Sequence, residues 1–189
     1  MSSHKRIHIY GHVSAQPQAI ANLFDAQLAS EIVAESDLAI FAINPAAGID
    51  QKTIDQWQAL SDFQLPRLVV VNELDGSDAD FEDAIMLANR VFDQLVTPFL
   101  VLHSESGSPI ALISLSDLQI IDYSTTPPTT SASESEHQEL VSEFREEYLE
   151  EIAGAGENAF AAGLLFPAIP IVISNGLGID VVKSFIAQL

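Results

Sequence analysis

The sequence contains no cysteine and very few basic residues. Without cysteine the chain can form neither a disulfide nor a thiolate metal site, which fits a cytoplasmic location. Only 7 lysine and arginine residues stand against 27 aspartate and glutamate residues, giving a net charge of −20. Nucleic-acid binding depends on Lys and Arg that neutralise phosphates, so this composition argues against a direct nucleic-acid partner. The acidic charge fits either a solvated surface, set by solubility or proteome bias, or a surface for a basic protein partner.

The sequence also lacks a hydrophobic run long enough to cross a membrane. Its most apolar stretch, residues 159–173, is shorter than the roughly 20 residues of a membrane-spanning helix and contains Pro167 and Pro170. No apolar segment follows the basic residues Lys5 and Arg6, so a secretory signal peptide is not expected. We therefore expect residues 159–173 to form part of a protein core and expect no membrane partner.

Strand-like and helix-like segments alternate along most of the chain. With 189 residues and a hydrophobic fraction of 48%, the chain fits one globular domain over residues 1–189. Short apolar runs predict buried strands, and apolar residues at helical spacing predict the helices between them. This order predicts an α/β fold with a mostly parallel sheet and helices on both faces, in three layers. The expected strands are 6–10, 37–43, 68–71, 99–102 and 170–174, and the expected helices are 18–33, 50–61, 78–95 and 179–189.

The alternating pattern is interrupted by an expected insert over residues 109–158. Residues 109–114 and 119–123 are typical of a hairpin or an edge insert. Residues 125–135 are rich in Ser, Thr and Pro and predict a mobile loop. An acidic amphipathic helix is expected next, over residues 139–152, with Leu140, Phe144, Tyr148 and Ile152 on its apolar stripe.

The turn after the first strand has the layout of a phosphate-binding loop without its functional residues. The P-loop pattern G-x-x-x-x-G-K-[ST] holds phosphates through backbone N–H groups and a lysine, and holds Mg²⁺ through a hydroxyl. From Gly11 onward, the second glycine, the lysine and the hydroxyl residue are replaced by Gln16, Pro17 and Gln18. Proline removes both the positive charge and a backbone donor. We therefore expect that this turn does not hold phosphate in the usual way.

Several segments, in the same order along the chain, resemble the GTP-binding domain of translation elongation factor G and its relatives. Gly11, His12, Val13 and Ala15 match the family's P-loop sequence Gly-His-Val-Asp-Ala-Gly-Lys-Thr. Residues 66–75 resemble the run that ends in the family's guanine-reading Asn-Lys-x-Asp, and residues 174–176 resemble its last guanine-contacting loop. Residues 42–53 and 79–81 are also similar to the family. The resemblance implies a P-loop-GTPase-like fold, and it extends over nearly all of the chain.

The departures from the family imply a degenerate GTPase, or pseudo-GTPase. Gly11 and Asn72 are 61 positions apart, whereas far more residues separate the corresponding motifs in the family. The family's switch I, two strands and the Asp-x-x-Gly motif are missing, so the fold is expected to be truncated near the switch region. Neither the catalytic histidine nor the hydroxyls that bind magnesium are present, and phosphoryl transfer depends on such groups. No catalytic residue and no metal site are therefore expected.

The resemblance also implies a vestigial guanine site. Asn72 and Asp75 match the two family positions that hold the base, and Ser174 matches the last contact loop. The family's lysine between the first two is replaced by Glu73, which reverses the charge. The competing interpretation is that Asn72 and Asp75 only build a turn at the end of a strand, which suits both residue types.

Three functional hypotheses follow. The first is a non-catalytic binding or regulatory domain without a cofactor, which contacts a protein partner or forms a homodimer through an exposed sheet edge. The alternative is a protein linked to translation that binds GDP or GTP weakly. The third is an enzyme of unrelated chemistry in the former phosphate crevice, with His12, Ser14 and His103 as candidates.

Two other clusters have simpler interpretations. The acidic residues around the expected third helix do not have the spacing of a Ca²⁺ loop and suit a helix start instead; they are Asp75, Asp78, Asp80, Glu82 and Asp83. His8, His12 and His103 could meet at strand ends. Without cysteines or a spaced histidine pair, ordinary packing is the favoured explanation.

Overall fold

The computed structural model describes residues 4–72, 74 and 79–189. Its main sheet has six strands, and each pair of neighbours is parallel. In spatial order they are β2 (Gln27–Leu28), β1 (Ile7–Gly11), β3 (Leu38–Ile43), β4 (Arg67–Val71), β10 (Phe166–Pro170) and β5 (Leu95–Val96). The central strands β3 and β4 are buried along their whole length, as their continuous apolar runs predicted. The α/β class and the mostly parallel sheet are thus confirmed.

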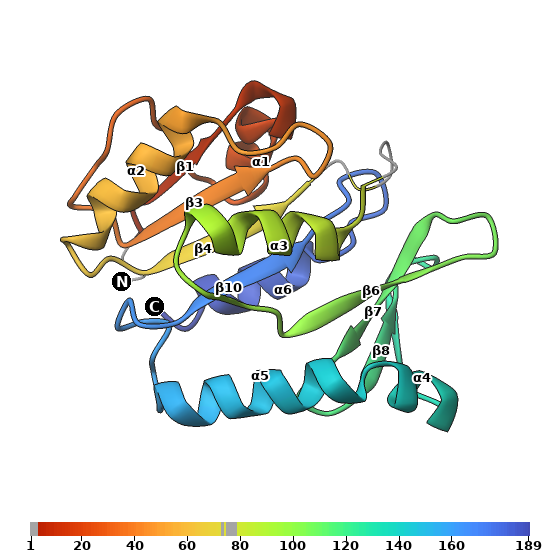
Figure 1. The fold of residues 1–189 in the computed structure, drawn as a ribbon. Helices are drawn as coiled ribbons and strands as arrows, with labels where there is room; N and C mark the ends of the chain where they lie inside the picture. Colours follow the sequence, from red (N-terminus) through yellow and green to blue (C-terminus); the bar gives the residue numbers. More distant parts are fainter. Residues whose placement is uncertain (1–3, 73, 75–78) are drawn as a thin grey trace.

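Helices cover both faces of this sheet. Figure 1 shows α2 and α3 in front of the strands and α6 behind them, which gives the predicted three layers. The helices are α1 (Pro17–Leu23), α2 (Gln51–Ser61), α3 (Phe81–Val91), α4 (Ser135–Leu140), α5 (Ser142–Ala155) and α6 (Ile179–Ile186), and a 3₁₀ turn, η1, spans Val13–Ala15. Within the described residues, no helix is both long and apolar enough to cross a membrane.

A second, antiparallel sheet of four strands lies beside the main one. Its strands are β6 (Phe99–His103), β7 (Pro109–Ser114), β8 (Gln119–Asp122) and β9 (Thr129–Ala132). The hairpin of β7 and β8 was predicted, but two assignments were wrong. Residues 99–102 begin this sheet instead of joining the parallel one, so the inserted structure starts before residue 109. Residues 125–135 are not a loop throughout, because β9 pairs with β8 over four residues.

Both errors have a physical origin. The run 99–102 is apolar enough to be a buried strand, but it is followed by a tight turn and a second apolar strand, and antiparallel pairing with that neighbour prevails. In β9 the pattern of Ser, Thr and Pro indicated a loop by composition. Thr129 and Thr130 are β-branched and therefore also suit an exposed edge strand.

Helix α1 is much shorter than the helix predicted over residues 18–33. It ends at Leu23, and Asp25 adopts a left-handed conformation with φ of 51°. The chain then turns to place Leu28 in β2, where it pairs with Ile9 of β1. The apolar residues beyond the turn had suggested a continuous helical stripe, yet they belong to this edge strand and the loop after it.

The last strand and the acidic helix are also displaced from their predicted positions. The strand expected at 170–174 is β10, which ends at Pro170 and contains Pro167. Prolines are unusual inside a sheet, yet β10 includes both Pro167 and Pro170 and shares only Pro170 with the expected strand. The acidic helix expected over 139–152 is divided into α4 and α5 at Val141. The helices expected at 50–61 and 179–189 are confirmed as α2 and α6. The helix expected at 78–95 is present as α3 but ends at Val91, and Leu95 belongs to strand β5; Asp78 lies outside the described residues.

A buried arginine at the start of β4 joins the main sheet to the helices that cover it. The side chain of Arg67 is 3% exposed, and its guanidinium lies 4.2 Å from the ring centre of Trp57 and 4.3 Å from that of Phe166. Its Nη2 lies 3.4 Å from a carboxylate oxygen of Asp93, which also accepts a 2.9 Å hydrogen bond from the Trp57 indole. Burial lowers the pKa of Arg67, and the Asp93 carboxylate opposes that effect. We call Arg67, Trp57, Phe166 and Asp93 the arginine clamp.

We expect Asp93→Ala to destabilise the fold because it leaves a buried guanidinium without its carboxylate and an indole without its acceptor. Because the Asp93 side chain is 51% exposed, solvent moderates the loss, and we expect about 2 kcal/mol in urea unfolding. The exposed Asp62→Ala should change stability by less than about 0.5 kcal/mol. Equal effects of the two substitutions would show that the carboxylate of the arginine clamp contributes nothing specific.

Candidate functional site

The turn that replaces the P-loop follows β1 and spans residues 11–16. Gly11 has φ of 146°, and a Cβ atom at this position would collide with the carbonyl oxygen of Ala42 on the neighbouring strand. Glycine is therefore required at the start of the turn. At the other end, Gln16 has a left-handed conformation with φ of 53°, in the position where the P-loop pattern has glycine. The backbone thus keeps a loop-like path although the second glycine is gone.

Three successive backbone N–H groups of this turn are bonded within the turn itself. Ser14 N donates to Nδ1 of His12 at 3.2 Å, and Ala15 N donates to the His12 carbonyl at 3.0 Å. Gln16 N donates to the Val13 carbonyl at 3.0 Å. The next residue, Pro17, begins α1 and has no N–H. A P-loop directs such donors at phosphate, whereas here they already have acceptors inside the protein.

Two asparagines hold the turn from the neighbouring strands. Asn44 follows β3, and its amide nitrogen donates to the Ser14 carbonyl at 2.9 Å. Asn72 follows β4, is 2% exposed, and donates to the Ala15 carbonyl at 2.9 Å. The carbonyl groups of Ser14 and Ala15 are thus bonded to amides at the carboxyl ends of the sheet strands. Asn44 was not singled out from the sequence; its position between a buried strand and Pro45 was the signal that could have found it.

The three residues of the predicted guanine site lie in different surroundings. Asn72 follows β4 and Ser174 follows β10. These strands pair in parallel, with Val71 opposite Pro170, so the two residues lie at the same, carboxyl end of the sheet. Asn72 is buried and bonded to the turn, and Ser174 is exposed in the loop after β10. That loop is held to the second sheet by Asn175, whose amide donates to the Pro109 carbonyl at 3.0 Å. Asp75, like Glu73, lies outside the described residues.

A hollow of about 530 Å³ lies beside the turn. It is lined by Gln16, Pro17 and Gln18 of the altered P-loop positions and by residues 28–30 at the end of β2 and just after it. Among the described residues that line it, Lys52 in the first turn of α2 is the one that carries a charge. Lys52 also was not identified from the sequence, because its place opposite the turn depends on how α2 packs against the sheet.

The three histidines each have their own surroundings. His12 Nδ1 lies 2.9 Å from the hydroxyl of Ser14, so these two candidates for unrelated chemistry do meet. His103, the third candidate, is the last residue of β6 and lies near Glu82. Burial and Asp80 raise the pKa of the Glu82 carboxyl, and His103 opposes this by lowering it. His8 lies 2.6 Å from the Ser36 hydroxyl, and burial lowers its pKa. Among the described residues, no group of three or more acidic, histidine or cysteine side chains is placed to hold a metal ion.

The acidic cluster before α3 has the expected helix-start role in its described part. Asp80 is the N-cap of α3, and its side chain accepts from Asp83 N at 2.9 Å. The Asp83 carboxylate in turn accepts from Asp80 N at 3.3 Å, which completes a capping box. Asp75 and Asp78 lie outside the described residues.

We expect Asn72→Ala to destabilise the protein more than Asn44→Ala. The first substitution leaves the buried Ala15 carbonyl without a donor and should cost about 2 kcal/mol, whereas water can reach the half-buried site of the second, which should cost about 1 kcal/mol or less. Urea unfolding of both variants measures the difference. If Asn44→Ala proved the more damaging change, the brace from β4 would not be the main support of the turn.

Comparison with known proteins identifies relatives of this chain. No protein-family model matches it. An "Elongation factor G-like protein" of Mycobacterium tuberculosis is 31% identical over 164 residues, covering 76% of this chain and 23% of the relative. The mitochondrial "Ribosome-releasing factor 2" of Drosophila melanogaster is 24% identical over 126 residues, covering 62% of this chain and 17% of the relative. The chain thus spans about a quarter or less of the length of the curated relatives it matches.

The fold has a solved counterpart. A crystal structure of a protein from Thermus thermophilus superposes with a TM-score of 0.71 at 21% identity, covering 82% of this chain and 26% of that one. The match in sequence confirms the resemblance indicated by residues 11–15 and 66–75, and the match in structure confirms the fold that it implied. The chain is thus related in sequence to elongation factor G-like proteins and has the fold of an elongation factor G-like G domain.

Proposed function

We propose that this chain is a non-catalytic binding domain that keeps the elongation factor G-like fold and does not hydrolyse GTP. The observation that carries the proposal is the hydrogen bonding of the turn. The N–H groups of Ser14, Ala15 and Gln16 donate to acceptors within residues 12–13. To hold a phosphate with these donors, the turn would have to break these bonds.

The charges around the turn support the same proposal. Phosphoryl transfer is catalysed mainly by positioning the phosphates and neutralising their charge. Gln16, Pro17 and Gln18 provide no positive charge, and Lys52 is the one cation that lines the adjacent hollow. The net charge of −20 adds a long-range field that repels a triphosphate. One exposed lysine on a different helix does not replace a P-loop.

A binding role also agrees with the extent of the relationship. The chain spans only a small part of the relatives, so the ribosome-releasing role in one printed name belongs to that protein and comes to this chain only as a proposal. We propose a protein partner in a translation-related setting, since the charge disfavours direct contact with RNA. A homodimer through the β2 edge and a cytoplasmic location stay predictions; β2 is two residues long and offers few backbone groups for edge pairing.

The second candidate function is weak guanine-nucleotide binding. It is favoured by the position of Asn72 and Ser174, which share one edge of the sheet as the family pattern requires. The side chain of Asn72 is engaged by Ala15, as a brace for the turn. Base contacts without phosphate contacts give low affinity, because few interactions remain to offset the cost of ordering the ligand.

Calorimetric titration with GDP and GTP, with and without Mg²⁺ and with ATP as a control, tests both candidates. We expect no guanine-specific binding in the micromolar range and no phosphate release from GTP above the buffer rate. The expected physical reason is that the donors of the turn stay bonded to its own acceptors. A full-length elongation factor G serves as the positive control for the release assay.

Three variants separate the outcomes. If guanine-specific binding occurs and Asp75→Asn abolishes it, the second candidate is correct and the turn adapts to the ligand. Gln16→Gly/Pro17→Lys/Gln18→Thr restores the P-loop residues, and binding by this variant alone would assign the loss to those three side chains. Phosphate release by the unaltered chain, abolished by Gly11→Ala, would overturn the proposal.

A further inference from the structure

The open edge of the main sheet lies at β2, beside the hollow at the turn. Within the described residues, β2 has β1 as its one neighbour in the sheet. Leu28 lies opposite Ile9, whose carbonyl accepts a 3.0 Å hydrogen bond from the N–H of Ala29. In this parallel register Ile9 bonds to the residues on either side of Leu28, so Leu28 itself directs its N–H and C=O away from β1. The edge therefore offers one backbone donor and one acceptor to a further strand.

Apolar side chains flank this edge. Leu28 is 47% exposed, and Val13 in η1 is 78% exposed. Both line the hollow of about 530 Å³, together with Pro17 and Ala19 of α1 and with Ala29 just after β2. This volume lies within the range of ligand pockets in proteins. The edge and the hollow thus form an exposed apolar surface, which is typical of an interaction site.

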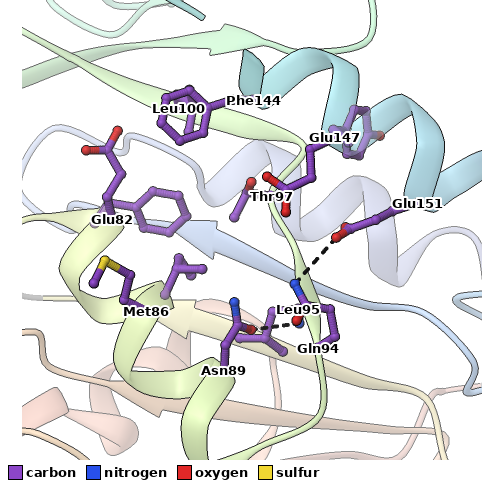
Figure 2. Close-up of a pocket in the computed structure, with 13 residues that line it drawn as sticks. Glu82, Met86, Asn89, Gln94, Leu95, Thr97, Leu100, Phe144, Glu147 and Glu151 are labelled. Atoms are coloured by element: carbon purple, nitrogen blue, oxygen red, sulfur yellow. Dashed lines mark hydrogen bonds between the residues drawn. The ribbon is translucent and has the colours of Figure 1, made fainter.

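The hollow differs in charge from the rest of the chain. Its described lining contains Lys52 and no carboxylate, although the chain has 27 acidic residues. By contrast, a groove of about 410 Å³ between α3 and α5 has three glutamates in its lining, and Figure 2 shows Glu82 on α3 and Glu147 and Glu151 on α5. No ion pair of Lys52 is found within the described part of the chain. Lys52 is therefore a local cation that an incoming carboxylate can meet.

The acidic group that suits Lys52 is a side chain and not a chain terminus. Proteins commonly capture a terminal carboxylate with several backbone N–H groups that converge on it. The N–H groups nearest the hollow, those of Ser14, Ala15 and Gln16, are bonded within the turn. A side-chain carboxylate needs only the lysine.

We infer that a partner protein adds an extended segment to β2, pairing with the backbone of Leu28 and placing an apolar side chain in the hollow and an aspartate or glutamate against Lys52. Strand addition to a sheet edge is a common mode of peptide recognition, in which pockets for alternate side chains give specificity. Because β2 has only two residues, the main-chain pairing is short, and the hollow and Lys52 select the segment. The inference names the partner chemistry of the binding role proposed above and rests on that role.

A second copy of this chain is a poorer occupant of the edge. Two copies paired through β2 would bring together two net charges of −20. A short segment with one acidic residue meets far less repulsion, and its single carboxylate lies beside Lys52.

Fluorescence anisotropy with labelled peptides of about nine residues, a usual strand length, tests the inference. The probe alternates threonine on one face with valine on the other, and a glutamate replaces one central valine. Two control peptides have glutamine or lysine in place of that glutamate. We expect the glutamate peptide to bind about threefold more tightly than the glutamine peptide, and the lysine peptide to bind more weakly still. The net charge of −20 alone would favour the lysine peptide, so the expected order is specific to the site.

Matched substitutions locate the binding site. Lys52→Gln should remove the preference for glutamate over glutamine, whereas Lys183→Gln, at an exposed lysine of α6, should keep it. Val13→Asp places a carboxylate in the hollow and should weaken binding about tenfold. Met86→Asp adds the same charge at a residue of α3 that is 60% exposed, and it should have less than about twofold effect. Thermal unfolding checks that each variant is folded.

Backbone methylation of the probe tests the pairing with Leu28. N-methyl groups on alternate residues block one edge of an extended peptide and leave the other edge free. We expect one of two peptides, methylated on opposite edges, to lose binding and the other to keep it. Equal binding by the two would exclude strand pairing.

Three further results would overturn the inference. The first is absence of binding by the glutamate peptide to the unaltered chain. The second is tighter binding of the lysine peptide, which would mean that only the overall net charge attracts the probe. The third is self-association in analytical ultracentrifugation that Val13→Asp abolishes, which would make a second copy the occupant. None of these results bears on the proposed lack of GTP hydrolysis, which phosphate release measures separately.

Discussion

A backbone N–H group can satisfy one acceptor well, and in this chain the donors of the turn after β1 are already used. Ser14, Ala15 and Gln16 donate within the turn, and the carbonyls of Ser14 and Ala15 accept from Asn44 and Asn72. Both kinds of group are therefore satisfied without a ligand. In a phosphate-binding loop the donors stay available for the anion, whereas here they are bonded inside the turn. Asn72, which the family pattern assigns to guanine, donates to the Ala15 carbonyl.

The amino end of the strands depends on a different interaction. The arginine clamp begins at the first residue of β4 and joins α2 through Trp57, the segment after α3 through Asp93, and β10 through Phe166. A buried guanidinium is tolerated there because two aromatic rings lie against it and a carboxylate pairs with it. The two ends of the sheet are thus held by different interactions: the arginine clamp at the amino ends of the strands and the two asparagines at the carboxyl ends.

The alternation of apolar runs was sufficient to predict the parallel sheet, its three layers and the central strands β3 and β4, because strands buried on both faces need continuous apolar sequence. The replaced P-loop residues were also visible directly. The local sequence pattern gave the wrong secondary structure where strand pairing between distant residues decides it. Residues 99–102 pair with β7 in the second sheet, and Leu28, expected in a helix, pairs with β1. In the site, the resemblance identified the position of Asn72, but its bond to Ala15 spans 57 residues and has no sequence signature.

The hollow beside the turn shows the same limit from the opposite direction. The sequence pattern placed Leu28 in a helix, and Val13 matched the family's P-loop. The structure leaves both side chains exposed beside the edge strand, and it brings Lys52 of α2 into the lining of the same hollow. The acidic charge that composition could not assign is absent from the described lining of this hollow and present in that of the groove between α3 and α5. An apolar surface with one lysine and no carboxylate differs from a merely solvated one, since solubility alone requires no exposed Leu28 or Val13.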